Sequence, residues 1–251
     1  MRILYFIAVF ALCCWSCGTD AKKNAADTAD SARDDHDHHQ HTDISPETAD
    51  SIISAAGRSS DTVNMVALPP VYEGDIVFQV SDAPHCQVFG KATGWKYNHM
   101  GVIFIRPKNG EYVVIEAYDT TRLISLREWV NRGNGQHVMI MRLKNANKII
   151  NEKKLDRLKK AARQYAKKPY DRYFGWGDDA LYASELVWKI YHEGIALRLG
   201  ELRKLKTLNL TSGEVSKQLK EKYGNKTPLE EDVITPKDIA DSPILEKVFE
   251  R

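Results

Sequence analysis

Three positions in this sequence have the residue types and surroundings of a nucleophilic catalytic site. His99 and Glu116 each lie in an apolar, β-branched segment, and position 183 lies where a helical pattern begins. A histidine base, a carboxylate that orients it and a cysteine at a helix N-terminus are the parts of a cysteine hydrolase. Position 183, however, is alanine, which cannot attack a substrate. The sequence therefore contains the partners of a nucleophile but lacks the nucleophile at the expected place.

The two apolar segments predict a β-hairpin that brings His99 and Glu116 together. Residues 99–105 and 112–117 are separated by a turn sequence at residues 107–110. If this turn closes a loop of two or four residues, odd positions face even positions, and both side chains share a face. The carboxylate would then fix the tautomer of the imidazole. A loop of odd length would separate the two, and a purely structural ion pair is the alternative interpretation.

A helix with one buried face is predicted from residue 183 to Gly194. Its apolar positions follow helical spacing: Ala183, Leu186, Val187, Ile190 and Tyr191. Free backbone N–H groups at a helix N-terminus stabilise a thiolate or an oxyanion, but Ala183 has nothing to ionise. Ser184 points about 100° away from it and is interpreted as a first-turn cap. Glu185 is interpreted as an acid that favours the first turn.

Cys86 is the one cysteine of the globular part, since the other three lie within the first 17 residues. It follows His85 in residues 84–94, a stretch with helical spacing that ends at Gly94. Cys86 is an alternative nucleophile, but we interpret it as a small buried hydrophobic residue. With one cysteine, no disulfide can form within this part of the chain.

Residues 1–16 have the pattern of an export signal. Arg2 precedes an apolar core at residues 3–15, which is shorter than the ~20 residues that a membrane-spanning helix needs. A small residue before Cys17 and a glycine after it fit a bacterial lipoprotein cleavage site; an ordinary secretory signal is the alternative. We therefore expect a lipid anchor at Cys17 that holds the protein on a membrane of the bacterial cell envelope, periplasmic or outer-membrane.

Residues 17–70 predict a disordered tether, because they are polar and poor in aromatic residues. The tether contains a tract rich in His and Asp at residues 34–41. Four histidines give it a weak possibility of metal binding: His36, His38, His39 and His41. Because no scaffold fixes their geometry, the preferred interpretation is a solvated spacer without a catalytic metal.

Residues 71–251 have the composition and length of one globular domain. Strands and helices are predicted in mixed order, with strands at 74–80, 99–105, 112–117 and 138–143 and helices at 84–94, 151–167 and 183–194. This order predicts an α+β fold, in which a short-stranded antiparallel sheet or a small barrel packs against helices. The net charge of +2, with acidic and basic residues interleaved, gives no indication of nucleic-acid binding.

Several segments, taken together and in order, resemble the YiiX/YaeF group of permuted papain-like cysteine hydrolases in the NlpC superfamily. The matching segments are residues 74–79, 98–102, 114–117, 126–129, 170–171, 181–187 and 234–243. Each motif alone is weak, whereas their order is specific and spans nearly all of residues 71–251. The resemblance implies a circularly permuted papain-like (NlpC-type) fold, in which the strand with the histidine precedes the nucleophile.

The resemblance also implies roles for individual residues. Position 183, here Ala183, is that of the nucleophile cysteine, His99 is the base, and Glu116 is the orienting acid. Four aromatic residues are expected to contact the substrate, with core packing as their alternative: Tyr182, Trp95, Tyr170 and Phe174. Such an enzyme is an amidase or hydrolase that cleaves an amide or ester bond through an acyl-enzyme, and no cofactor is implied.

Ala183 has two possible origins, an engineered Cys-to-Ala substitution and a natural loss of the nucleophile. Intact His99 and Glu116 favour the first, because a chain without catalysis has no chemical need for both. Either way, we expect this form to be inactive; the alternative function is a natural pseudoenzyme that binds a lipid or cell-wall ligand in the retained cleft. The expected substrate is a small molecule, an acyl lipid or a peptide, and the aromatic residues at 170–176 favour an acyl-bearing amide or ester.

The N-terminal segment generates a prediction about location. Metabolic labelling with a fatty-acid analogue should tag the full chain through Cys17, and Cys17→Ser should abolish the label and release the protein into the soluble fraction. Cys13→Ser, which changes a cysteine inside the apolar core, is the control and should stay labelled. A protein that is soluble and unlabelled with Cys17 present would contradict the anchor.

Overall fold

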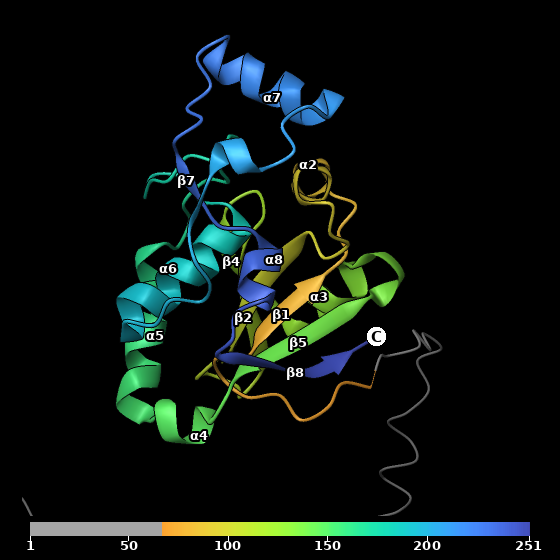
Figure 1. Ribbon diagram of the computed structural model, residues 1–251. Coiled ribbons are helices and arrows are strands. Elements are labelled where there is room, and N and C mark those ends of the chain that lie inside the picture. Colours follow the sequence, from red (N-terminus) through yellow and green to blue (C-terminus); the bar gives the residue numbers. More distant parts are fainter. Residues whose placement is uncertain (1–66) are drawn as a thin grey trace, which may run out of the picture. The chain divides into compact units, whose positions relative to one another are not determined.

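An antiparallel sheet forms the centre of the domain (Figure 1). The structure, a computed structural model, describes residues 67–251. The predicted export signal, Cys17 and the histidines at positions 36, 38, 39 and 41 lie outside these residues. The sheet has the order β4-β3-β2-β1-β5-β8, with β4 and β8 at its edges, so the domain contains the open sheet of the prediction and not the barrel.

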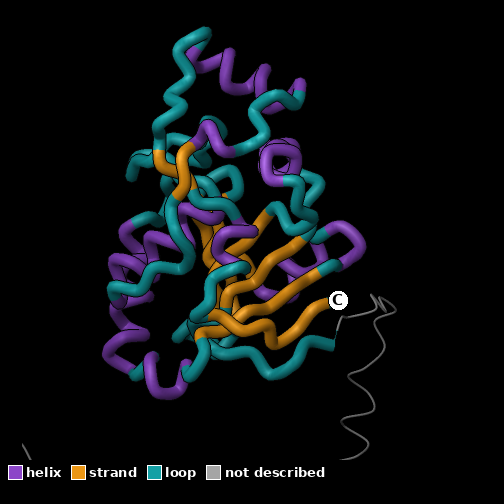
Figure 2. Tube along the Cα trace, viewed as in Figure 1, coloured by secondary structure: helices purple, strands orange, loops and turns teal. Residues whose placement is uncertain are grey.

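The sheet strands are short, as predicted. They are β1 (Ile76–Gln79), β2 (His99–Ile105), β3 (Tyr112–Ala117), β4 (Thr121–Ser125), β5 (Val138–Leu143) and β8 (Leu245–Glu250). A separate two-stranded ladder joins β6 (Arg203–Lys204) to β7 (Asp232–Val233). Figure 2 shows the strands of the main sheet as one layer with helices and loops around it, and the β6–β7 ladder apart from this layer.

The helices confirm the predicted ones at residues 84–94, 151–167 and 183–194 and add others. They are α2 (Pro84–Thr93), α3 (Leu126–Arg132), α4 (Ala146–Ile149), α5 (Glu152–Gln164), α6 (Ala183–Ile195), α7 (Gly213–Tyr223) and α8 (Pro236–Ala240), with 3-10 turns η1 (Asn134–Gln136) and η2 (Leu205–Thr207). None of the helices within residues 67–251 is long and apolar enough to cross a membrane.

The two faces of the sheet bury different side chains, because neighbouring residues of a strand point to opposite faces. On one face, Met100 and Val102 of β2 join the apolar cluster that contains α2, α5 and α6. On the other face, Ile103 of β2 packs with Trp129 of α3. In Figure 1, α5 and α6 lie side by side against the sheet.

The predicted hairpin is formed by β2 and β3. The N–H of Arg106 donates to the carbonyl of Glu111 at 2.8 Å, so the loop is the four-residue turn 107–110. This even length pairs odd with even positions, as in Val102 opposite Ile115. The parity argument from the sequence is therefore confirmed, and it places His99 and Glu116 on the same face of the sheet.

Gly101 allows the two strands to approach closely beside this pair. A Cβ atom at position 101 would lie 2.4 Å from the carbonyl oxygen of Ile115 and 2.4 Å from a methyl carbon of Val114. Real Cβ atoms do not come so close to other atoms, so alanine at this position would force the strands apart. The glycine between His99 and Val102 is thus a packing requirement of the hairpin.

Candidate functional site

The centre of the candidate site is a buried pair of His99 and Glu116. His99 is the first residue of β2 and Glu116 the penultimate residue of β3, so both lie at the same end of the sheet. Nε2 of His99 lies 2.7 Å from Oε2 of Glu116, and both side chains are fully buried. The hydrogen bond fixes the orientation of the imidazole and directs its other nitrogen, Nδ1, away from the carboxylate.

Two arginines hold Glu116 in its ionised form. Arg122 lies opposite Glu116 on β4 and donates from Nε to Oε1 at 3.0 Å. Arg132, at the end of α3, donates from one nitrogen to Oε1 at 2.9 Å and from another to Oε2. Burial alone would raise the pKa of Glu116, but the hydrogen bonds from His99 and Arg132 and their charges outweigh burial and hold this pKa far below its usual range.

Aromatic rings enclose the imidazole. Trp129 of α3 stacks on His99 with ring centroids 6.1 Å apart, and Tyr118 meets His99 edge-on at 5.7 Å. The same Tyr118 ring carries the guanidinium groups of Arg132 and Arg122 at 4.2 and 4.8 Å from its centroid. Tyr118 therefore joins the imidazole to both arginines in one packed cluster.

Cys86 lies next to the imidazole of His99. It is the third residue of α2, 1% exposed, and interacts with both His99 and His85. Burial would raise the pKa of the Cys86 thiol, but the positive charge of His99 and the hydrogen bond from His85 lower it to about 6. The thiol interacts with the imidazole. Within the described residues, however, Nδ1 of His99 makes no hydrogen bond of conventional geometry.

The same interaction changes the protonation of His99. Burial would lower its pKa, but the negative charge of Cys86, the close contact with this thiol and the hydrogen bond to Glu116 raise the pKa to about 9. Near neutral pH the two groups are therefore an imidazolium and a thiolate. An ion pair of this kind supplies both a nucleophile and a proton donor.

Position 183 begins α6, as the sequence predicts. Ala183 is 5% exposed and belongs to the apolar cluster that α2, α5 and α6 form against the sheet. Ser184, beside it, donates its hydroxyl to the carbonyl of Ile234 at 2.8 Å, and Glu185 pairs with Lys189 at 2.9 Å. Ser184 therefore joins α6 to the segment before α8, and burial raises the pKa of Glu185 to about 8 although Lys189 lowers it.

The four aromatic residues that were expected to contact the substrate do not lie together in the structure. Tyr182 and Phe174 are fully buried and pack around Phe89 of α2 with centroid distances of 5.0 and 4.6 Å, so both lie in the core. Trp95 packs edge-on against Phe78 at 5.9 Å, also in the core cluster. Tyr170 alone of the four adjoins the site, with its ring 4.3 Å from that of His85.

Some residues of the site were not recognised in the sequence. They are Arg122, Arg132, Tyr118 and the ring of His85. Arg122 was within reach of sequence reasoning, since predicting β4 would have made it the cross-strand partner of Glu116. Arg132 lies on α3 and His85 on α2. No local sequence pattern predicts how these helices pack against the sheet.

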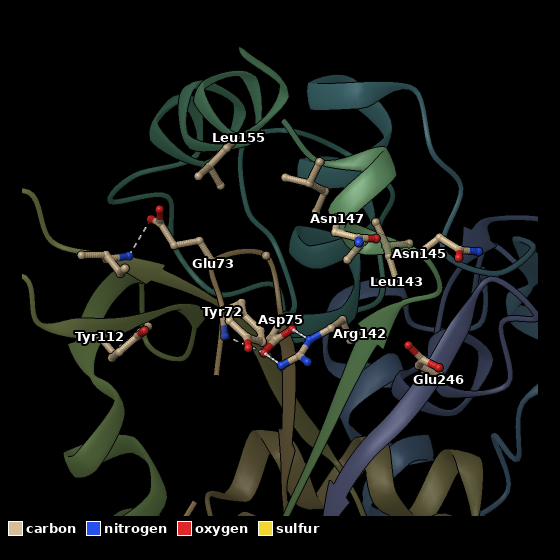
Figure 3. A pocket seen from close by; sticks show the side chains of 14 residues that line it. Tyr72, Glu73, Asp75, Tyr112, Arg142, Leu143, Asn145, Asn147, Leu155 and Glu246 are labelled. Atoms are coloured by element: carbon tan, nitrogen blue, oxygen red, sulfur yellow. Dashed lines mark hydrogen bonds and ion pairs between the residues drawn. The ribbon is translucent and has the colours of Figure 1, made fainter. Parts of the chain in front are cut away.

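A cavity of about 700 Å³ lies at the other end of the strands (Figure 3). It is lined by Gly74 and Asp75, which precede β1, and by Ile105, which ends β2. Asp75 is held there by Arg142, whose Nε donates to it at 2.7 Å. Since His99 begins β2 and pairs with Gln79 at the end of β1, this cavity is not part of the His99 site.

An imidazole between a buried carboxylate and a thiol is the arrangement of papain-like cysteine hydrolases. Comparison with known proteins agrees with this class. Residues 70–249 match the family of permuted papain-like amidase enzymes of the YaeF/YiiX type, and the chain belongs to this family. The predicted family and α+β fold are thereby confirmed.

Two relatives illustrate the similarity. The chain is 37% identical over 175 residues to the uncharacterized protein YiiX of Escherichia coli, an alignment that covers 70% of this chain and 84% of the relative. It is also similar to a crystal structure of YiiX from Escherichia coli, described as a metalloprotein, with a TM-score of 0.65 and 34% identity. That comparison covers 71% of this chain and 97% of the other.

The ionic cluster generates a prediction about stability. Glu116→Gln leaves two partly buried arginines without their counter-charge and should lower the free energy of unfolding by about 3 kcal/mol. Glu111→Gln, which breaks the more exposed pair with Arg106, is the matched control and should cost about 1 kcal/mol or less. Urea unfolding of both variants measures the difference, and equal small losses would contradict a central role for Glu116.

Proposed function

We propose that this protein is a cysteine hydrolase of the bacterial cell envelope that cleaves an amide or ester bond through an acyl-enzyme. The observation that carries the proposal is the buried His99–Glu116 pair, whose second imidazole nitrogen is free to serve a thiol. Membership of an amidase family supports the same reaction class. The export signal and Cys17 support the location.

The residues of the site would share the reaction as follows. A thiolate attacks the carbonyl carbon of the substrate, and His99 gives its Nδ1 proton to the departing amine or alcohol. Water then attacks the acyl-thioester and passes a proton to His99, which releases the acid and restores the thiolate. Glu116 keeps its negative charge throughout and stabilises the imidazolium.

Position 183 cannot supply this thiolate in the present chain. The resemblance assigns the nucleophile to that position, at the N-terminus of α6, and Ala183 has no ionisable group. If position 183 were the only place for a nucleophile, the chain would therefore be inactive. The second candidate function, a non-catalytic protein that binds a lipid or cell-wall ligand, rests on this same observation.

The substrate class is the least constrained part of the proposal. We favour an acyl-bearing amide or ester over a bare cell-wall peptide, because a lipid anchor at Cys17 would hold the domain beside a membrane. Tyr170, which adjoins His85, offers an aromatic surface next to the site.

The test uses p-nitrophenyl esters and N-acyl p-nitroanilides with short and long acyl chains. The chain or its Ala183→Cys variant should hydrolyse them, and His99→Ala should lower kcat by a factor of about 100 or more, because the base is lost. His137→Ala, which removes an exposed histidine, should leave turnover unchanged.

The outcomes separate the two candidate functions. Absence of hydrolysis in both forms, or hydrolysis that persists without His99, would leave the ligand-binding alternative. A kcat/KM that does not rise with acyl length would contradict the preference for acyl substrates.

A further inference from the structure

We propose that Cys86 is the nucleophile of this chain and takes the place of the cysteine absent from position 183. The proposal rests on the proposed function, hydrolysis assisted by His99, and names the thiol that performs it. It departs from the interpretation of Cys86 as a buried hydrophobic residue. It also gives the intact His99–Glu116 pair a use in a chain with alanine at position 183.

The first observation is the free nitrogen of His99. The imidazole is fully buried, Nε2 is occupied by Glu116, and Nδ1 makes no conventional hydrogen bond within residues 67–251. Leaving a buried polar atom without a partner costs free energy, so this nitrogen calls for an explanation. Cys86 is the thiol that interacts with the same imidazole.

The second observation is the place of Cys86 in its helix. α2 begins after Ala83 with Pro84 as its first residue, so Cys86 lies in the first turn. This turn has no acidic residue and no side-chain cap, and the helix dipole therefore favours a negative charge there without competition. The nucleophile of a cysteine hydrolase requires the same location at a helix N-terminus.

The third observation is a set of hydrogen bonds that ties this turn to the strand of the base. Asn98, which directly precedes His99, accepts from the N–H of Ser81 at 2.8 Å and donates to its carbonyl at 2.9 Å. Gln87, which follows Cys86, donates to the same carbonyl at 2.7 Å. Asn98 and Gln87, the chain neighbours of His99 and Cys86, thus both bond to Ser81, and these bonds fix the position of the thiol relative to the imidazole.

A route to the thiol is provided by a second cavity, of about 570 Å³, between α2 and α7. His85 lines this cavity, packs against Tyr118 at 4.9 Å and Tyr170 at 4.3 Å, and interacts with Cys86. Cys86 is only 1% exposed and does not itself line the cavity, so the proposal requires neighbouring side chains such as His85 to move and admit the carbonyl of a substrate.

The reaction at Cys86 needs no reactant other than the substrate and water. The Cys86 sulfur forms a bond to the carbonyl carbon, the bond to the amine or alcohol breaks, and the proton of His99 leaves with that group. Water then replaces sulfur on the acyl carbon and returns a proton to His99. The products are an acid and the amine or alcohol.

The first experiment compares hydrolysis of the same p-nitrophenyl esters by four proteins: the full chain, Cys86→Ser, Ala183→Cys, and the double variant. We expect the chain to be active and Cys86→Ser to lose turnover by a factor of about 100 or more. Activity confined to proteins with Ala183→Cys would overturn the role of Cys86 and leave the proposed function intact. Inactivity of all four would overturn the proposed function itself.

The second experiment does not depend on turnover or access. The ultraviolet absorbance of the thiolate is titrated in the full chain, with the Cys86→Ser protein subtracted to remove the other cysteines. We expect a transition near pH 6, moved upward by at least about one pH unit in His99→Ala because the imidazolium is lost. A transition near the ordinary pKa of cysteine in both proteins would overturn the proposal. Circular dichroism checks that each variant folds, and Cys86→Ala replaces Cys86→Ser if the latter does not.

Discussion

The negative charge of Glu116 is the constraint around which this end of the molecule is built. A buried carboxylate is unfavourable unless it is paired, and here β2, β4 and α3 each bring one positive partner to it, His99, Arg122 and Arg132. β2, β4 and α3 are separate segments of the chain. Their meeting at one carboxylate fixes how α3 docks on the sheet and how the imidazole is oriented.

The proposed nucleophile comes from outside the hairpin that carries the proposed base and its acid. His99 and Glu116 lie on β2 and β3, whereas the Cys86 thiol reaches the imidazole from α2. α2 brings Cys86 there, and α6 brings position 183 to the N-terminus of a second helix. Phe89, three residues after Cys86, contacts Tyr182, one residue before Ala183, so the two helices pack together near these positions. α2 and α6 thus each carry one of the two candidate nucleophile positions in their first turn.

The sequence predicted those parts of the fold that depend on local patterns. The hairpin parity was correct because its turn has an even length, and α6 was correct because its apolar face is regular. β4 and β8 were not predicted, since charged residues such as Arg122 and Lys247 interrupt their apolar patterns.

The candidate site was predictable only in part, for a related reason. His99 and Glu116 follow from strand pairing, which the sequence encodes locally. The approach of Cys86 to His99 depends on the bonds between Asn98 and Ser81, which join segments that no periodicity connects. The proximity of a thiol and an imidazole is therefore a tertiary property that only the folded chain reveals.

The two arginines on Glu116 limit how protons can move through this site. A carboxylate whose pKa lies far below its usual range is a poor acceptor for the second proton of the imidazole, so Nε2 keeps its hydrogen while Nδ1 exchanges one. In the proposed mechanism, only the Nδ1 proton of His99 is therefore transferred, and a relay of two protons from the thiol through the ring to the carboxylate is unfavourable. The proton that leaves with the first product is the one that water must restore before the next turnover.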